Sequence, residues 1–195
     1  MSLIASDFMS LDGVVQAPGG PDEDTDGRFA HGGWSHPYFD EDVMGAVFGD
    51  AATATGALLF GRRTWQTMAA AWPERAGDPF ADHMNSVDKY VVSQTLTQEN
   101  LDWNNSTLIP SDDVAASVAD LKTRVDGNIQ ILGSSRLVRY LVGHDLIDEF
   151  SLMIHPIILG GGKRLFSDDG IVRTLKLRDL KQASTGVLIV TYTRA

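Results

Sequence analysis

The chain has 195 residues, of which 43% are hydrophobic, and this size and composition suit one globular domain over residues 1–195 with a substantial core. Its 26 acidic and 16 basic residues give a net charge of −10, which argues against binding to nucleic acid or to an anionic membrane. Cysteine is absent, which excludes disulfides, zinc–thiolate sites and a cysteine nucleophile, and no metal site is predicted. Because a basic leader and any run of about 18 apolar residues are missing, we expect a soluble, cytoplasmic protein.

The first expected strand lies in residues 3–15, a mostly apolar and β-prone segment that Asp12 and Gly13 interrupt. We expect this opening strand to be central in the sheet and to run into a turn. Residues 16–37 are rich in Gly, Pro and Asp and are too long for an ordinary connection, so they form either a flexible insertion or a loop that covers a site. Trp34 is the candidate substrate contact in this loop, although loop aromatics more often serve as anchors.

A helix is expected over residues 40–55, where apolar side chains recur at helical spacing and three acidic residues occupy the first turn. A buried parallel strand follows at residues 57–60, and a second helix covers 64–71. Between them, the sequence GRRTW combines a glycine turn, two arginines and a helix N-terminus, which together predict an anion site. Arg62 is favoured as the ligand contact, and Arg63 as a solvated surface residue.

The middle of the chain is expected to hold a short helix (79–86), two strands (89–92 and 107–109) and an amphipathic helix that Asp112 caps. The apolar stripe of that helix indicates packing on the sheet. The dipeptide Ser93-Gln94 follows the first of these strands, where its side chains could bind a ligand or cap a loop.

The segment 128–166 has the strongest pattern: an apolar strand, a Gly-Ser-Ser turn, an amphipathic helix and a second strand over residues 149–159. Such a βαβ unit has parallel strands and opens its first turn at their carboxyl ends, where ligands of these sheets bind. The free N–H groups of Ser134, Ser135 and Arg136 would then face a phosphate. An ordinary capped helix explains the turn equally well, and GSSR is not the dinucleotide fingerprint GxGxxG.

The C-terminal part combines a glycine turn with a hairpin. Gly160-Gly161-Gly162 either lets a ligand approach the backbone or only makes a sharp turn. Residues 173–194 carry alternating apolar residues on both sides of Ser184-Thr185-Gly186, which predicts a β-hairpin. We therefore expect an α/β fold whose mostly parallel sheet is finished by antiparallel strands.

These junctions resemble the dihydrofolate reductase superfamily. GRRTW is similar to its GRxTW element, Ser93-Gln94 stands in the place of its Ser-Ser-Gln segment, and LGSSR resembles its Ile-Gly-Gly-Gly-Arg turn, with serines replacing two glycines. The resemblance implies a three-layer α/β/α sandwich and an NADPH cofactor. It implies cofactor-binding roles for Val15, Gly61, Arg62, Thr64, Ser93, Gln94, Gly133, Ser134, Ser135, Arg136 and Leu137.

More closely, the chain resembles the reductase domain of bifunctional riboflavin biosynthesis enzymes, the RibD C-terminal domain family, and its stand-alone members. SLDGVV, LFGRRTW, the segment ending in HPIILGGGKRLF and the terminal hairpin follow that group's order over nearly the whole chain. The resemblance implies NADPH-dependent reduction of a small pterin-like or ribitylaminopyrimidine-like heterocycle by a homodimer. The alternative is a non-catalytic nucleotide- or ligand-binding protein that keeps the cleft without turnover.

Two sets of carboxylates are candidates for proton donation. The dihydrofolate reductase family keeps a carboxylate near the start of its first helix, the region of Asp40, Glu41 and Asp42. Asp12 is the other candidate, because it lies beside the expected nicotinamide end of the first strand. Burial there would raise its pKa toward a value useful for proton transfer, whereas an exposed turn aspartate would keep its ordinary pKa.

Overall fold

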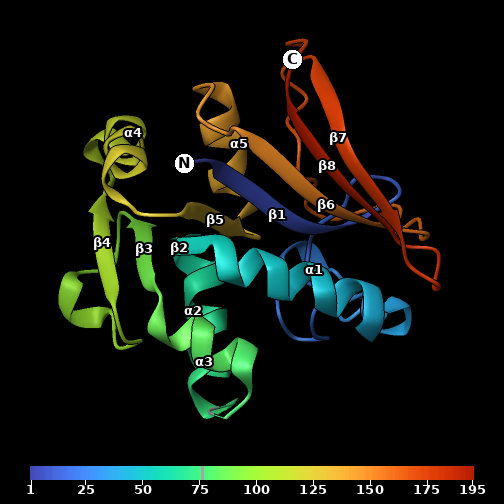
Figure 1. Cartoon of the computed structure of the whole chain (residues 1–195), viewed down its shortest axis with the longest axis horizontal. Helices are drawn as coiled ribbons and strands as arrows, with labels where there is room; N and C mark the ends of the chain where they lie inside the picture. The colour runs from blue at the N-terminus through green and yellow to red at the C-terminus, as the bar shows by residue number, and fades with distance from the viewer. Residues whose placement is uncertain (76) are drawn as a thin grey trace.

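The computed structural model describes residues 1–75 and 77–195 and shows one sheet between two layers of helices (Figure 1). The strands are β1 (Leu3–Ser10), β2 (Thr55–Gly61), β3 (Asp88–Ser93), β4 (Ser106–Pro110), β5 (Asn128–Leu132), β6 (Glu149–His155), β7 (Leu175–Gln182) and β8 (Leu188–Arg194). Their order is β4-β3-β2-β5-β1-β6-β8-β7; the first six strands in this order run parallel, and β8 is antiparallel to both of its neighbours. The predicted parallel sheet with an antiparallel C-terminal hairpin is confirmed.

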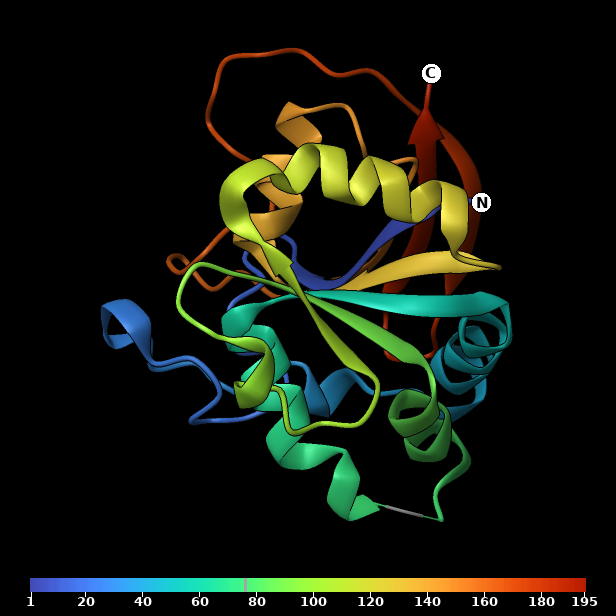
Figure 2. The ribbon, with the colours of Figure 1, turned by 90° about the vertical axis from the view of Figure 1, so that its left-hand side faces the viewer.

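The helices form one layer on each face of the sheet. One face carries α1 (Glu41–Ala54), α2 (Arg62–Ala71) and α3 (Pro79–Ser86), and the other carries α4 (Val114–Arg124) and α5 (Ser135–Gly143) (Figure 2). Alternate side chains of β2 reach both layers: Ala57 and Leu59 join the cluster under α4 and α5, whereas Leu58 and Phe60 pack against α2 and α3. The three-layer α/β/α arrangement is therefore confirmed. Among the described helices, none has the length and hydropathy needed to cross a membrane.

At two element ends, a single side chain explains the difference from the sequence-based boundary. Asp113, not Asp112, is the N-cap of α4, because the Asp113 side chain accepts a backbone N–H of the first turn at 2.9 Å. β6 ends at His155 and does not continue to residue 159, because Pro156 has no N–H with which to extend the ladder. Both differences come from single side chains at the boundary.

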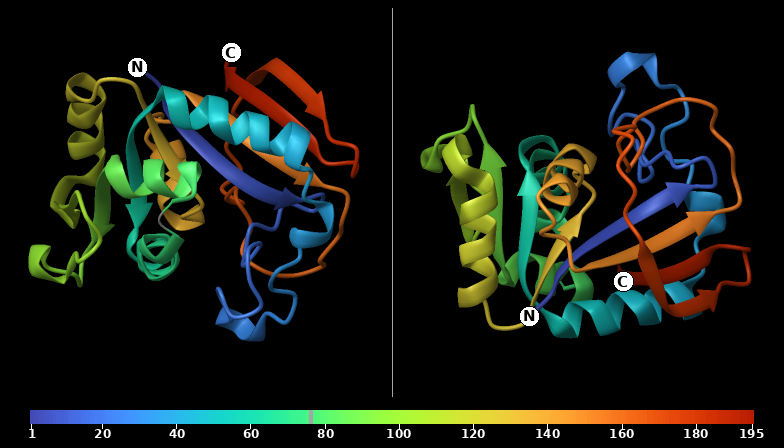
Figure 3. Two further views of the ribbon diagram at one scale, coloured as in Figure 1. Left: turned by 60° about the horizontal axis from the view of Figure 1, so that its bottom comes forward. Right: turned by 90° about the horizontal axis from the view of Figure 1, so that it is seen from above.

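The connections of the sheet reverse direction between β1 and β5. β1 leads through α1 to β2, whereas β5 leads through α5 past β1 to β6, and Figure 3 shows α1 and α5 on opposite sides of β1. The register of the two strands ends at Ser6 and Leu132, where the Ser6 carbonyl accepts the N–H of Gly133 at 3.2 Å. Ligands of open α/β sheets bind at such a reversal, outside the carboxyl ends of the strands, and we refer to this place as the β1–β5 crevice.

Candidate functional site

The N-termini of α2 and α5 meet at the carboxyl edge of the sheet. The N–H of Gly61 donates to the Ser134 Oγ at 2.9 Å, and a Cβ placed on Gly133 would come within 3.4 Å of the Thr64 Cγ2. Gly133 (φ +66°) and Ser134 (φ 59°) both have a left-handed backbone, which glycine adopts readily and serine seldom does. Four residues of the predicted cofactor site are therefore neighbours.

The first turn of α5 leaves backbone N–H groups free. Ser134 does not cap the helix with its side chain, because its hydroxyl oxygen already accepts the N–H of Gly61. No described residue accepts a hydrogen bond from the N–H groups of Ser134, Ser135 or Arg136. Free N–H groups at a helix start attract anions, and the helix dipole strengthens that attraction. The turn has the donors of a phosphate site.

Two of the arginines at this junction form no ion pair or hydrogen bond with any described residue. Arg62 is half-buried and Arg136 is exposed, whereas Arg63 pairs with Asp26. A guanidinium group without a carboxylate partner can form two parallel hydrogen bonds to a phosphate. The geometry thus favours Arg62 over Arg63 as a ligand contact.

β3 brings Ser93 to the same edge. The register of β2 and β3 ends with Gly61 opposite Val92, and Arg62 and Ser93 are the residues that follow this pair. Ser93 is buried, and its Oγ accepts two N–H groups of the following turn at 3.1 and 3.0 Å. Its hydroxyl hydrogen remains available to donate to a ligand. Gln94 is exposed beside it.

Val15 and Leu137 contribute their side chains to the core. Leu137 is 7% exposed, and Val15 packs against the same cluster. The N–H of Val15 donates to the Lys163 carbonyl at 2.9 Å. Neither side chain faces a ligand position, so any cofactor contact of these two residues would come from backbone atoms.

Asp12 is the anchor of a turn, and its pKa is lowered, not raised. Its carboxylate accepts the Ser10 hydroxyl at 2.6 Å and the N–H groups of Leu159 and Gly160 at 3.1 and 3.0 Å. The Ser10 hydrogen bond, helped by the two N–H groups, lowers the pKa of Asp12 to about 2. Such a strong acid holds no proton near neutral pH, which corrects the expectation of a raised pKa suited to proton donation.

Asp40 caps α1 and holds the C-terminal hairpin. Its Oδ1 accepts the N–H of Val43 at 3.0 Å, and its Oδ2 accepts the hydroxyl and the N–H of Ser184 at 2.6 and 2.8 Å. The Ser184 hydroxyl, and then these N–H groups, lower the pKa of Asp40. Glu41 and Asp42 are exposed on the first turn. This corrects the prediction that these acids are placed to donate a proton. Asp40 begins the helix and holds the hairpin, whereas Glu41 and Asp42 face solvent.

The unpaired carboxyl group in the interior is Asp7, which the sequence analysis missed. Asp7 is 8% exposed, and its Oδ2 is buried without a hydrogen-bond partner in the described part of the chain. Burial raises the pKa of Asp7 well above its ordinary value. The only sequence signal was an acidic residue inside the strand LIASDFMS.

Trp34 anchors the long connection. Its indole N–H donates to the Gln16 carbonyl at 2.8 Å, and its ring meets the fully buried His155 edge-on, with 5.1 Å between ring centroids. Phe8 and Tyr38 also contact His155, and burial lowers the pKa of this histidine. Because Trp34 is only 6% exposed, the structure favours the anchor over the predicted substrate contact.

Residues 16–37 are fixed by polar contacts at the carboxyl edge of the sheet. The Gln16 amide donates to the carbonyls of Asp24 and Asp26, both at 3.0 Å, and accepts the N–H of Lys163 at 3.0 Å. The Lys163 ammonium group pairs with the Asp24 and Asp26 carboxylates at 2.5 and 2.8 Å. The connection is therefore packed as a loop that can shield a neighbouring site.

The glycine turn at Gly160-Gly161-Gly162 serves this packing. A Cβ on Gly162 would lie 2.8 Å from the Val14 side chain and 2.9 Å from the Phe29 ring, and its φ of +120° also disfavours other residues. Gly160 donates its N–H to Asp12. The sharp turn, one of the two alternatives for these glycines, accounts for both residues.

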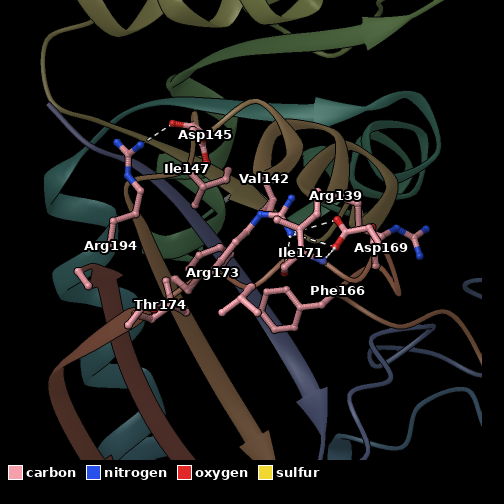
Figure 4. A pocket seen from close by; sticks show the side chains of 15 residues that line it. Arg139, Val142, Asp145, Ile147, Phe166, Asp169, Ile171, Arg173, Thr174 and Arg194 are labelled. Atoms are coloured by element: carbon pink, nitrogen blue, oxygen red, sulfur yellow. Dashed lines mark hydrogen bonds and ion pairs between the residues drawn. The ribbon is translucent and has the colours of Figure 1, made fainter.

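A separate cavity of about 570 Å³ lies at the other end of α5 (Figure 4). Its walls are mainly apolar and include Val142, Ile147, Phe150, Phe166 and Ile171. The Arg173 guanidinium lies across it and pairs with the Asp169 carboxylate at 3.0 Å. No residue of the predicted cofactor site lines this cavity, so the crevice at α2 and α5 remains the candidate site.

Comparisons with known proteins agree with the fold. A model of the RibD C-terminal domain matches residues 1–189. The uncharacterized protein YyaP of Bacillus subtilis is 30% identical over 150 residues, which cover 74% of this chain and 77% of YyaP.

A Shewanella protein assigned to riboflavin biosynthesis has a TM-score of 0.76 at 21% identity, over 100% of this chain and 99% of that one. Dihydrofolate reductase from Enterococcus faecalis, complexed with NADP(H), has a TM-score of 0.58 at 14% identity, over 99% and 96% of the two chains. At these identities the two solved structures show the shared fold alone. With the family match over almost its full length, the chain belongs to the RibD C-terminal domain family.

Proposed function

We propose that the protein is an NADPH-dependent reductase of a small heterocycle, either pterin-like or ribitylaminopyrimidine-like. One observation carries this proposal: two helix N-termini meet beside the β1–β5 crevice, with free N–H groups and with Arg62 and Arg136 free of described partners. In a chain of net charge −10, such a basic edge is a local exception that suits a phosphorylated ligand. Family membership supports reductase chemistry, and the NADP(H) complex of the Enterococcus enzyme supports the cofactor.

The residues present fit NADP(H). Arg62 and Ser93, which follow the last paired residues of β2 and β3, would hold the 2′-phosphate. Thr64 and the N–H groups of residues 134–136 would hold the pyrophosphate. Because the sheet order is β3-β2-β5-β1, a dinucleotide held in this way directs its nicotinamide end toward the β1–β5 crevice.

When bound, NADPH supplies a hydride to an electron-poor carbon of the heterocycle. The chain's part is to hold the acceptor beside the cofactor and to exclude bulk water with residues 16–37. Asp12 and Asp40 have lowered pKa values and structural hydrogen bonds. We therefore assign the accompanying proton to a solvent water molecule.

Two measurements test the proposal. Isothermal titration calorimetry should show NADPH binding, and the NADPH absorbance should fall in the presence of at least one member of a panel of pterins, flavin precursors and quinones. Binding without consumption of NADPH by any of them would favour the non-catalytic ligand-binding alternative. Absence of NADPH binding would overturn the proposed function.

A further inference from the structure

The cavity of about 570 Å³ at the far end of α5 has the size and the walls of a small-molecule site. Pockets for small molecules measure about 300–1,000 Å³ and combine mainly apolar walls with a few polar groups that orient the ligand. Here Ile147 and Phe150 form buried walls, whereas Phe166 and Ile171, from the segment between β6 and β7, are exposed. The apolar part of a ligand would cover these side chains and so remove apolar surface from water.

The arginines around this cavity differ in their partners. Arg173 pairs with Asp169 at 3.0 Å, and Arg194 pairs with Asp148 at 2.8 Å. Arg139 is half-buried and forms no ion pair with any described residue; its guanidinium donates to one backbone carbonyl, at 3.3 Å. Because a guanidinium has five N–H donors, Arg139 keeps enough of them to bind an anion through two parallel hydrogen bonds.

The two ends of the cavity differ in charge. Figure 4 shows Asp145 and Arg194 at one end, and Arg139 and Asp169 at the other. α5 ends at Gly143, two residues before Asp145, so the helix dipole and the Asp145 carboxylate both disfavour an anion at the first end. Asp169 at the second end is neutralised by its arginine, which leaves the positive charge of Arg139 uncompensated. An anionic group would therefore lie beside Arg139.

We propose that this cavity binds a small organic monoanion, a carboxylate on an apolar body, and that it does so independently of the proposed cofactor. The carboxylate pairs with the Arg139 guanidinium, and the apolar body lies against Phe150 and Phe166. One uncompensated guanidinium matches a single negative charge. A phosphate group, with nearly two charges near neutral pH, would need a second cationic partner, and both Arg173 and Arg194 are already paired.

Octanoate and 1-octanol test this class of ligand, because they share an apolar chain and differ in charge. By isothermal titration calorimetry, the native protein should bind octanoate about 10-fold more tightly than 1-octanol, as expected for a hydrogen bond to a charged group at a half-buried position. Arg139→Leu should bring this ratio close to one and leave the affinity for 1-octanol nearly unchanged. Arg124→Leu, which removes an exposed arginine of α4, is the matched control and should keep the native ratio.

Two further measurements locate the binding. Val142→Trp places a ring inside the cavity and should weaken the binding of both probes about 10-fold or more, because it occupies the space for the chain. 2′,5′-ADP should not displace octanoate, since no residue of the predicted cofactor site lines this cavity. If circular dichroism shows that the tryptophan variant does not fold, the Arg139→Leu ratio and this competition decide.

Four outcomes would overturn the inference. The native protein binds no octanoate, or Arg139→Leu keeps the native ratio. Displacement by 2′,5′-ADP would place octanoate in the β1–β5 crevice. Octanoate that converts a native dimer into monomers in light scattering would identify a second copy of the chain as the natural occupant of the cavity.

Discussion

Arg62 and Arg63 are adjacent and chemically identical, but only Arg63 has a carboxylate partner among the described residues. The 2′-phosphate distinguishes NADPH from NADH, and a hydrogen bond to a charged group contributes about 1.5–3 kcal/mol. We predict that NADPH binds about 10- to 100-fold more tightly than NADH. Arg62→Ala should remove most of this preference, whereas Arg63→Ala, the matched control, should keep it. Calorimetric affinities that are equal for both cofactors in the native protein would contradict the assignment.

Asp12 should make the stability of the fold depend on acidic pH. Its folded-state pKa of about 2 lies below the ordinary value of 3.8. The unfolded chain therefore takes up the proton first, so the stabilisation is complete above the unfolded pKa and is lost as the pH falls through the folded pKa. Asp12→Asn should lower the free energy of unfolding at neutral pH and flatten its decline between about pH 4 and pH 2. Urea unfolding at each pH measures both effects, and a native slope in the variant would assign the decline to other carboxylates.

The residues of the proposed anion site could be recognised from sequence, because a glycine turn, an arginine and a helix start are local features. The roles of the carboxylates could not, since each depends on a partner far along the chain. Asp12 bonds to the N–H of Leu159, and Asp40 to Ser184. Asp7 illustrates the same limit: a strand sequence contains the acid, but only the structure shows that its carboxyl group is buried without a partner among the described residues.

At the level of elements, helices and strands could be predicted because their patterns are local. β2 has a continuous apolar run because both of its faces are buried. α4 has a single apolar stripe because only one of its faces packs against the sheet. The insertion of β1 between β5 and β6 could not be predicted, because periodicity gives the faces of a strand and not its neighbours. That insertion creates the crevice.

The long loop offers a prediction at the same scale. Gln16 is 3% exposed, and its amide joins Asp24, Asp26 and Lys163. Gln16→Leu keeps a similar volume but leaves those backbone groups without their partner, so residues 17–33 should exchange their amide hydrogens about 10-fold faster or more. Hydrogen exchange followed by mass spectrometry measures this, with α4 as the internal reference. Equal protection in both proteins would show that Trp34 and the ion pairs suffice to hold the loop.

In the whole molecule, the helices cover the sheet unequally. α4 and α5 lie over the parallel strands, but the same face continues over β8 and β7, beyond α5 in Figure 1. Leu177 and Leu180 pair with Tyr192 and Val190 on this face and remain 48% and 53% exposed. Val172, which lines the neighbouring cavity, is 91% exposed. Exposed apolar side chains on an uncovered sheet face are typical of a subunit interface.

We therefore predict a homodimer in which a second copy covers the open face of β7 and β8. In a two-fold interface each substitution acts twice, and burying an unpaired carboxylate is strongly unfavourable, so the double variant Leu177→Glu/Leu180→Glu should be monomeric. Ala119→Glu, on the exposed side of α4, adds one negative charge elsewhere and should remain dimeric. Light scattering at micromolar concentration reports the mass of each protein. A monomeric native protein would contradict the prediction, and a dimeric double variant would place the interface on another surface.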